Sequence, residues 1–322
     1  MRRRSSLCSC ALVTCALVSS LLADGGMVVP SQYEIEEYGQ VGVISFFDAR
    51  EELAIATNFY SWSPDIAWVL PLPSEPAVDS VNAGLFRDLE YHCRPLYRSS
   101  SSFSCGPYAG SRGPLGETDS SSLREVTSGV IGDFVYQVLC AYRADTLEHY
   151  LRNHGYSLPS GATAVFQHYL ARNWNYFVVA RARDSIPYYE SRTLGIKLSF
   201  STDSIVFPLY ISRLGSSVGS DVILYVAANH RQFFPGARTR FSGPADTSTF
   251  SAYPDFIDRA CRLTKLTRTY RTEAMQDLTL RQAPDDQDYR EVQENGGYEI
   301  WTFGGLGLVL LMRRRRKKGL RD

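Results

Sequence analysis

"QVGVISFFDAREELAIATNFYS", Gln40 to Ser61, is the stretch that decides the fold class of this chain. Residues 40–49 and 51–61 are rich in apolar and aromatic side chains and flank a tight polar break, which is typical of a β-hairpin. A third apolar run, Asp65–Pro73, ends at prolines, which donate no backbone N–H to a strand ladder. The chain is therefore expected to build its core around a sheet.

Composition agrees with a folded, strand-rich protein. The 322 residues are 44% hydrophobic and 21% charged, which is ordinary for a globular chain and allows one large domain or two modest ones. The 20 Tyr and 16 Phe favour β structure, because aromatic rings fit a pleated, half-buried surface.

Helical patterns interrupt the strands. Val81, Leu85 and Leu89 share one helical stripe, and capped apolar patterns predict further helices over 145–155 and 160–173. Strand patterns return after them, together with a short helical pattern at 253–261. The predicted later strands cover 129–142, 176–182, 193–201, 205–212, 221–229 and 262–270. Runs of strands interrupted by a helix pair indicate an α+β fold with two or three short helices.

The N-terminus has the pattern of a secretory signal over residues 1–23. Arg2–Arg4 form a positive region, Leu7–Leu22 an apolar region, and Ala23 precedes a predicted cleavage before Asp24. Leu21 is not the small residue preferred three positions before a cut, so a retained N-terminal anchor is the alternative. Either interpretation places the following domain, residues 24–280, outside the cytoplasm.

The C-terminus carries a second membrane pattern. Residues 281–299 are polar and turn-rich and predict a stalk, and residues 300–312 form an apolar run. Thirteen helical residues span about 20 Å, less than the bilayer core of about 30 Å, so a strained span or a cleaved sorting segment is expected. The basic tail 313–322 then stays in the cytoplasm. Packing of this apolar segment on the body is the alternative.

Charge is distributed unevenly along the chain. The formal net charge is zero, but ten of the 34 cations lie at the two ends, which leaves 24 cations against 33 of the 34 anions between them. An acidic body argues against a nucleic-acid partner. The expected partners are the membrane, through the C-terminal segment, and an envelope protein or glycan.

Four cysteines remain after the signal, which allows two disulfides in an exported protein. Cys93 and Cys105 bracket a Ser/Gly-rich loop at 94–122 and are the favoured pair, with Cys140 and Cys261 as the second; free thiols are the alternative. No CxxC spacing or histidine cluster indicates a metal, and no Walker or dinucleotide fingerprint indicates a cofactor.

No catalytic constellation is evident. Gly215–Gly219 spells GxSxG, but a strand pattern follows it, whereas the hydrolase motif requires a helix there to expose Ser217. A hairpin turn is the preferred interpretation. An envelope hydrolase that pairs Ser217 or an acid with His149, His154 or His230 is the alternative. Trp62, Trp68 and Trp174, together with the many tyrosines, are candidates for a platform that stacks on sugars or peptides, or for core packing.

Three parts of the chain resemble a known family. The passages are "FFDAREELAIATNFYSWSPDIAWVLPLPSEPAVDSVNAGLFRDLE", "DFVYQVLCAYRADTLEHYLRNHGYSLP", and "LSFSTDSIVFPLYIS" with the later "LTKLTRTYRTEAMQDLTL". They resemble an uncharacterised family of exported bacterial proteins, domain-of-unknown-function family 2330, over about residues 25–280. The resemblance implies export and an envelope location and supplies no activity, cofactor or catalytic residue. We expect a membrane-tethered envelope protein that binds a partner without catalysis.

Overall fold

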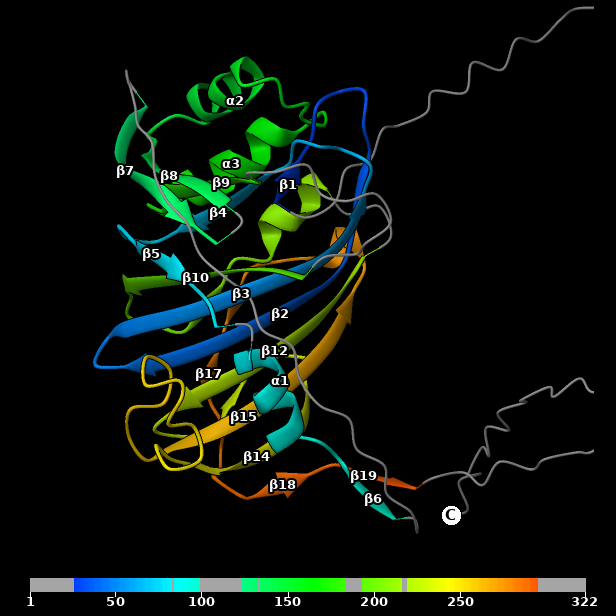
Figure 1. The fold of residues 1–322 in the computed structure, drawn as a ribbon, viewed down its shortest axis with the longest axis vertical. Helices are drawn as coiled ribbons and strands as arrows, with labels where there is room; N and C mark the ends of the chain where they lie inside the picture. The colour runs from blue at the N-terminus through cyan, green and yellow to red at the C-terminus, as the bar shows by residue number, and fades with distance from the viewer. Residues whose placement is uncertain are drawn as a thin grey trace, which may run out of the picture.

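Two large sheets, three two-stranded pairs and three α-helices are the main elements of the part of the chain that the structure describes. This computed structural model describes residues 26–82, 84–98, 123–132, 134–182, 193–215 and 219–294. Figure 1 shows the large sheet in the middle and lower part of the molecule and the smaller sheet above it, next to the helices. The described residues confirm the predicted strand-rich α+β class.

The large sheet has eight strands in the order β18-β14-β15-β12-β2-β3-β10-β5. Its pairs are antiparallel except for β12 and β2, which run parallel. The strands are β2 (Ile35–Phe47), β3 (Arg50–Ser61), β5 (Ala77–Ser80), β10 (Thr193–Ser201), β12 (Ser220–Ala228), β14 (Arg238–Ala245), β15 (Cys261–Tyr270) and β18 (Tyr289–Arg290).

The predicted hairpin is the centre of this sheet. Phe47 pairs with Arg50, and the two residues between them, Asp48 and Ala49, have φ angles of 53° and 56°. Positive φ at both positions makes the type I′ turn that matches the twist of paired strands. On β2, the position where a Cβ of Gly42 would lie is 2.7 Å from Leu224 and 2.8 Å from Phe207, so this strand needs a glycine where the core presses against it.

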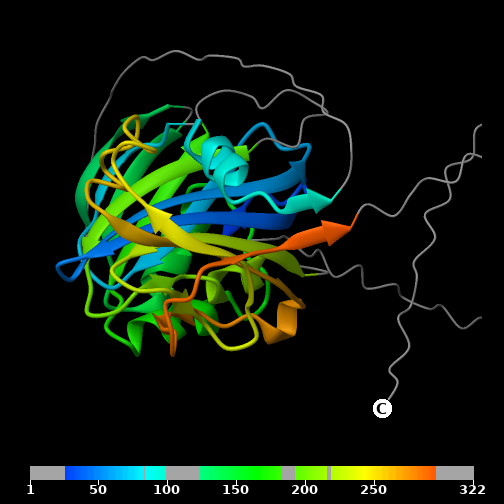
Figure 2. The same cartoon turned by 90° about the horizontal axis from the view of Figure 1, so that it is seen from below.

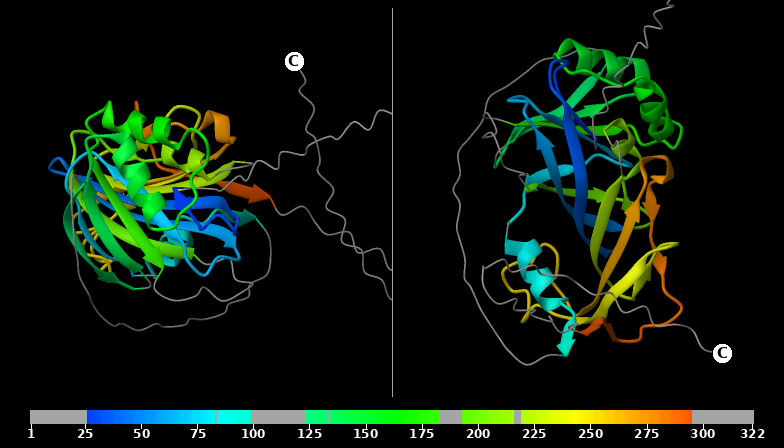
Figure 3. Two further views of the ribbon diagram at one scale, coloured as in Figure 1. Left: turned by 90° about the horizontal axis from the view of Figure 1, so that it is seen from above. Right: turned by 90° about the vertical axis from the view of Figure 1, so that its right-hand side faces the viewer.

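The smaller sheet has five strands in the order β1-β4-β9-β8-β7, all antiparallel. These strands are β1 (Met27–Val28), β4 (Ala67–Leu72), β7 (Arg124–Ile131), β8 (Phe134–Cys140) and β9 (Tyr176–Ala182). The helices are α1 (Gly84–His92), α2 (Ala144–Asn153) and α3 (Ala162–Leu170), with 3₁₀ turns η1 (Tyr210–Leu214) and η2 (Thr272–Ala274). Figure 3 shows α2 and α3 at one end of the molecule and β6 (Leu96–Arg98) at the other.

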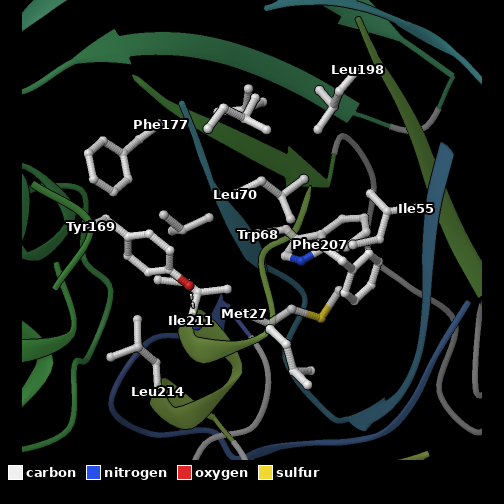
Figure 4. Close-up of a cluster of buried hydrophobic side chains, with 14 of the residues drawn as sticks. Met27, Ile55, Trp68, Leu70, Tyr169, Phe177, Leu198, Phe207, Ile211 and Leu214 are labelled. Atoms are coloured by element: carbon white, nitrogen blue, oxygen red, sulfur yellow. Dashed lines mark hydrogen bonds between the residues drawn. The ribbon is translucent and has the colours of Figure 1, made fainter. Parts of the chain in front are cut away.

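One continuous core joins the two sheets. Figure 4 shows Trp68 and Leu70 from β4, Phe177 from β9 and Leu198 from β10 gathered with Phe207 between the layers. We call the side of the large sheet that faces this core its inner face. A second core lies on the outer face, where α1 and residues 246–260 cover Val43, Ala54 and Tyr225. In the described part of the chain, this covering lies over one part of the outer face.

Three short strand pairs attach the end of the chain to the body. These pairs are β11 (Val206–Phe207) with β16 (Leu278–Thr279), β13 (Gln232–Phe233) with β17 (Arg281–Gln282), and β6 with β19 (Val292–Glu294). Residues 281–294 therefore pair with body strands, and Ala283 and Glu291 are buried. The predicted stalk is wrong for these residues, because free sheet edges give this polar segment backbone partners.

Other local predictions also differ from the structure. Residues 205–212 form the short β11 and then η1 instead of one strand, and 253–261 form turns instead of a helix. Residues 129–142 contain the end of β7 and the whole of β8, which pair as a hairpin, instead of one strand. Ala23, Asp24, residues 99–122 and residues 295–322 lie outside the described residues, so the signal cleavage, most of the Ser/Gly-rich loop and the apolar tail stay predictions.

Candidate functional site

The histidines and serine proposed for a hydrolase do not form a common site among the described residues. His149 is exposed on α2, and the Nδ1 atom of His154 lies 2.8 Å from the carbonyl oxygen of Tyr150, one turn back. His230 follows β12 in the large sheet and pairs with Asp286 at 2.8 Å. Ser217 lies outside the described residues. The GxSxG hypothesis therefore stays untested by the structure.

The described cysteines form no disulfide with one another. Cys140 lies on β8 of the smaller sheet and Cys261 on β15 of the large sheet, so their predicted disulfide is not formed. Burial raises the pKa of Cys93 to about 12 and the pKa of Cys261 to about 11, which disfavours the reactive thiolate. Cys105 lies outside the described residues, so its pairing with Cys93 stays a prediction. Within the described ranges, no three His, Cys, Asp or Glu side chains are grouped for a metal.

Two of the three tryptophans in the predicted stacking platform are buried, and one is exposed. Trp68 and Trp174 are buried, so their packing role is structural. Trp62 is 41% exposed, just after the end of β3. The idea of a platform made from all three tryptophans is therefore wrong, and the tyrosines around Trp62 decide what this surface can do.

Two tyrosines extend the exposed surface of Trp62. Tyr38 and Tyr60 are 46% and 45% exposed, and the Tyr60 ring lies 5.7 Å from the Trp62 ring in an edge-to-face arrangement. Tyr60 is paired across the strands with Glu36, and Tyr38 stands at a register shift two residues further along β2. Cross-strand neighbours at this spacing lie about 5 to 8 Å apart. We call Tyr38, Tyr60 and Trp62 the aromatic patch.

Strand geometry explains why these rings point outward. Side chains of a strand alternate between the two faces, so Glu36 and Tyr38 share the outer face while Ile35 and Glu37 point into the core. The covering provided by α1 and residues 246–260 lies further along the sheet, over Val43 and Ala54. Among the described residues, this covering does not reach the patch, which lies at the end of the sheet where β2 begins and β3 ends (Figure 1).

Acidic side chains border the aromatic patch. Glu36 is exposed beside Tyr60, and Asp221 is exposed on the neighbouring strand β12, opposite Gly39. The Thr269 hydroxyl donates to Asp221 at 2.5 Å and holds that carboxylate in place. Large rings beside fixed hydrogen-bond acceptors make a surface that can stack on a ring-shaped ligand and accept protons from its hydroxyl groups.

A buried acid lies under this surface, on the inner face. Burial raises the pKa of Glu37 to about 8, and neither carboxylate oxygen has a hydrogen-bond partner among the described residues. Gln40 and Thr57 flank the carboxyl, but Gln40 donates to the Ser212 hydroxyl at 2.6 Å and Thr57 to the Gly39 carbonyl at 3.4 Å. Glu37 is therefore held mainly in its neutral form at neutral pH.

A second buried acid, Glu51, lies on the same inner face at the other end of the hairpin. Burial raises its pKa well above the ordinary value, and one oxygen accepts the backbone N–H of Val206 at 2.9 Å. The other oxygen has no partner in the described part of the chain. The inner face thus carries two sequestered acids, too far along the hairpin from each other to act as a catalytic pair.

A polar cluster around Asp277 is a feature that no sequence motif predicts. This buried carboxylate accepts the Tyr169 hydroxyl at 2.7 Å, the Tyr210 backbone N–H at 2.9 Å and a guanidinium N–H of Arg172, and it lies 3.1 Å from His168 Nε2. The His168 ring stacks on the Tyr210 ring with centroids 3.9 Å apart. Asp277 lies more than 100 residues from α3, so no local pattern could indicate this contact.

The Asp277 cluster holds elements together. Its members join α3, η1 and the segment after η2, and both carboxylate oxygens are occupied by donors of the protein itself. Burial and the nearby Asp277 raise the pKa of Tyr169 well above its ordinary value, and the Tyr169 hydroxyl also accepts the Ile211 N–H at 2.7 Å, as Figure 4 shows. A site with its acceptors already saturated is structural in character.

Fold and surface thus define a strand-rich α+β protein with exposed aromatic side chains at one end of its large sheet. The chain belongs to a bacterial family, because residues 18–283 match the family model described as an uncharacterized protein conserved in bacteria (DUF2330). This match confirms the resemblance found in the three sequence passages. No helix among the described residues combines the length and hydropathy needed to cross a membrane.

Comparisons with characterised proteins add little. No curated protein matches the chain. Among solved structures, the crystal structure of baculovirus P35 aligns with 82% of this chain and 100% of its own at 10% sequence identity and a TM-score of 0.36. A TM-score this low does not establish a shared fold, so no property of P35 is carried over.

Proposed function

We propose that this protein is an exported, membrane-tethered envelope protein that binds glycan through its aromatic patch and does not catalyse a reaction. The single observation that carries the binding proposal is the exposure of Tyr38, Tyr60 and Trp62 side by side on one sheet face. Monomeric proteins rarely leave neighbouring large aromatic side chains uncovered without a binding role.

A sugar is the ligand class that fits this chemistry. One face of a pyranose ring presents C–H groups that stack on an aromatic ring, and its edge presents hydroxyl groups. Glu36 and Asp221 border the patch and accept hydrogen bonds from such hydroxyls. Tyr and Trp supply rigid, amphipathic contact area at a small cost in side-chain entropy.

The export and tether parts of the proposal come from the chain ends. The signal pattern over 1–23 and the basic tail 313–322 behind the apolar run 300–312 give the same orientation, with the body outside. Cell fractionation tests this part alone. Intact polypeptide in the cytosol, with the signal retained, would rule the topology out.

Glycan binding is tested by titrating the protein with soluble envelope polysaccharide and following binding by calorimetry. The double variant Tyr60→Ala/Trp62→Ala is expected to weaken binding by about tenfold or more, because central aromatic residues dominate interface energy. The matched control is Tyr142→Ala, which removes a tyrosine that is 74% exposed before α2. Equal affinity of all three proteins, or binding to basic peptides alone, would refute a glycan patch.

The hydrolase alternative gives a different result in the same experiment. Hydrolysis releases new reducing ends from the polysaccharide, whereas binding leaves the chain length unchanged. Reducing ends that accumulate with the wild-type protein and are lost in Ser217→Ala would support the alternative.

A further inference from the structure

A second group of exposed apolar side chains lies far from the aromatic patch. Tyr91 and Leu96 are 65% and 54% exposed, and Val292 and Tyr289 are 49% and 43% exposed. They come from the end of α1, from β6, and from β18 and β19. We call these four residues the apolar rim. Figure 1 shows these elements at the bottom of the molecule, opposite the end where β2 begins.

The centre of the rim is a ribbon of only two strands. β6 and β19 run parallel, and Leu96 is paired with Val292, so both side chains stand on the same face. The Leu96 N–H donates to the Glu291 carbonyl at 2.9 Å. Figure 2 shows the ribbon projecting from the body. A two-stranded ribbon that exposes its apolar pair to water is only marginally stable, which indicates that something covers it.

Two arginines give the rim a positive charge. The Arg94 guanidinium lies 4.2 Å from the centre of the Tyr91 ring, and Arg290 donates to the Arg94 carbonyl at 3.4 Å. Neither guanidinium pairs with a carboxylate among the described residues. The nearby acids pair with other cations. Glu291 is buried and pairs with Arg238 and Arg240. The more exposed Glu90 and Asp288 pair with Lys265 and Arg262. The rim is therefore apolar and cationic, whereas the aromatic patch is bordered by acids.

The length of chain beyond β19 fixes where the rim is held. Described structure ends at residue 294, and the apolar run 300–312 begins after five more residues. Five residues reach at most about 18 Å even when fully extended. If 300–312 is in a bilayer, as the proposed function has it, the ribbon end of the body is confined to the bilayer surface.

From these observations we infer that the apolar rim is a lipid-contacting surface, which seats the body on an anionic membrane. Leu96 and Val292 enter the headgroup boundary, and Tyr91 and Tyr289 lie at the level where amphipathic rings are preferred. Arg94 and Arg290 face the phosphates of acidic lipids. This inference rests on the proposed tether but goes beyond it, because a tether alone leaves the orientation of the body free.

The test places an environment-sensitive fluorophore on the rim of the full chain. The variant Val292→Cys carries the label, Leu96→Cys is a second rim position, and Tyr142→Cys is the control at the opposite end. The partly buried Cys261 and the cysteines outside the described residues are changed to serine, and Cys93 and Cys140 are kept because they are buried, so that only the new thiol is labelled. The labelled chains are incorporated into vesicles of phosphatidylglycerol and phosphatidylcholine that contain brominated lipid.

The expected result is a blue-shifted spectrum and quenching by brominated lipid at both rim positions, with neither effect at the control. In the double variant Arg94→Gln/Arg290→Gln, quenching should decrease on vesicles that contain phosphatidylglycerol and stay unchanged on pure phosphatidylcholine. The reason is that the two arginines strengthen membrane contact only where acidic lipid is present. Vesicle-bound protein whose rim labels are open to aqueous iodide would overturn the inference while leaving the tether intact. Protection from iodide without quenching by lipid would mean that a second copy covers the rim, and would overturn it too. Protein that remains unbound to vesicles would overturn the tether and the inference together.

Discussion

Replacement of Glu37 by glutamine tests whether the inner face of the large sheet holds a neutral carboxylic acid. Glu37 is fully buried, and its carboxyl oxygens have no partner among the described residues. Burial raises the pKa of Glu37 from 4.5 to about 8 in the folded protein. The folded state then binds a proton that the unfolded chain releases above pH 4.5, so the free energy of unfolding falls as the pH rises through this window.

The size of the effect follows from the two pKa values. Each unit of difference between the folded and unfolded pKa values corresponds to about 1.4 kcal/mol. The free energy of unfolding therefore loses about 5 kcal/mol in total once the pH exceeds 8. Between pH 5 and pH 8 the expected loss is about 3 to 4 kcal/mol, with the steepest fall near neutral pH. Glutamine has nearly the same shape and no titration, so Glu37→Gln removes this pH dependence.

The assay is urea unfolding of the wild type and of Glu37→Gln at several pH values from 5 to 9. The stability of the variant relative to the wild type is expected to rise across this range and to level off above pH 8. Glu36→Gln is the matched control, because Glu36 is the exposed neighbour on the opposite face of the strand. A difference between Glu37→Gln and the wild type that stays constant with pH would refute the buried-acid argument, whatever its sign.

Other predictions address the core, the Asp277 cluster and the thiols. Gly42→Val should lower the free energy of unfolding by about 2 kcal/mol, because it overpacks the core. In the control Gly39→Ala the new Cβ has its nearest neighbour at 3.6 Å, so the unfolding midpoint should stay nearly unchanged. Equal effects of the two variants would contradict the close packing at Gly42. Asp277→Asn should lower the free energy of unfolding by about 3 kcal/mol, because it leaves buried donors and a guanidinium without their charge partner. An unchanged midpoint of urea unfolding would contradict a stabilising role for the Asp277 cluster. Native Cys261 should react with a disulfide reagent at pH 8 faster than Cys93, which is fully buried. Unfolding should then release Cys93 as well, and a Cys93 that stays unreactive in urea would indicate the predicted disulfide instead.

The hairpin and the helices were predictable because their signals are local. Residues 40–61 carry strand composition on both sides of a two-residue break, and 144–153 carry a helical pattern with polar residues at both ends. Backbone geometry and neighbours within four positions are enough to form such elements. These local signals placed β2, β3 and α2 within a few residues of their observed bounds.

The missed elements depend on partners that are distant in sequence. Residues 205–212 have strand composition, but the chain turns into η1 after Phe207, where α3 and the Asp277 cluster receive it. Residues 281–294 are too polar for a strand prediction, and they pair only because β13, β14 and β6 offer free edges. Tertiary contacts overrode local preference in each case.

The candidate site shows the same division between local and distant signals. Glu36 and Glu37 are adjacent in sequence, and strand alternation places one on each face, so a single strand contributes both to the patch border and to the buried acid. Trp62 was recognised as a candidate from its residue type alone. The sequence pattern does not single out Tyr38 and Tyr60 from the other tyrosines, because only the register of β2 with β3 brings them beside Trp62.

Charge assigns different partners to the two exposed aromatic surfaces. The aromatic patch has Glu36 and Asp221 at its border, and these carboxylates would be repelled by an anionic bilayer. The apolar rim has Arg94 and Arg290 beside its rings, and these cations would be drawn to the same bilayer. Since the two surfaces lie at opposite ends of the molecule, seating the rim on lipid turns the patch outward, toward the glycan that we propose it binds. Lipid quenching found at the patch instead of the rim would reverse this orientation and remove the patch from the reach of such a ligand.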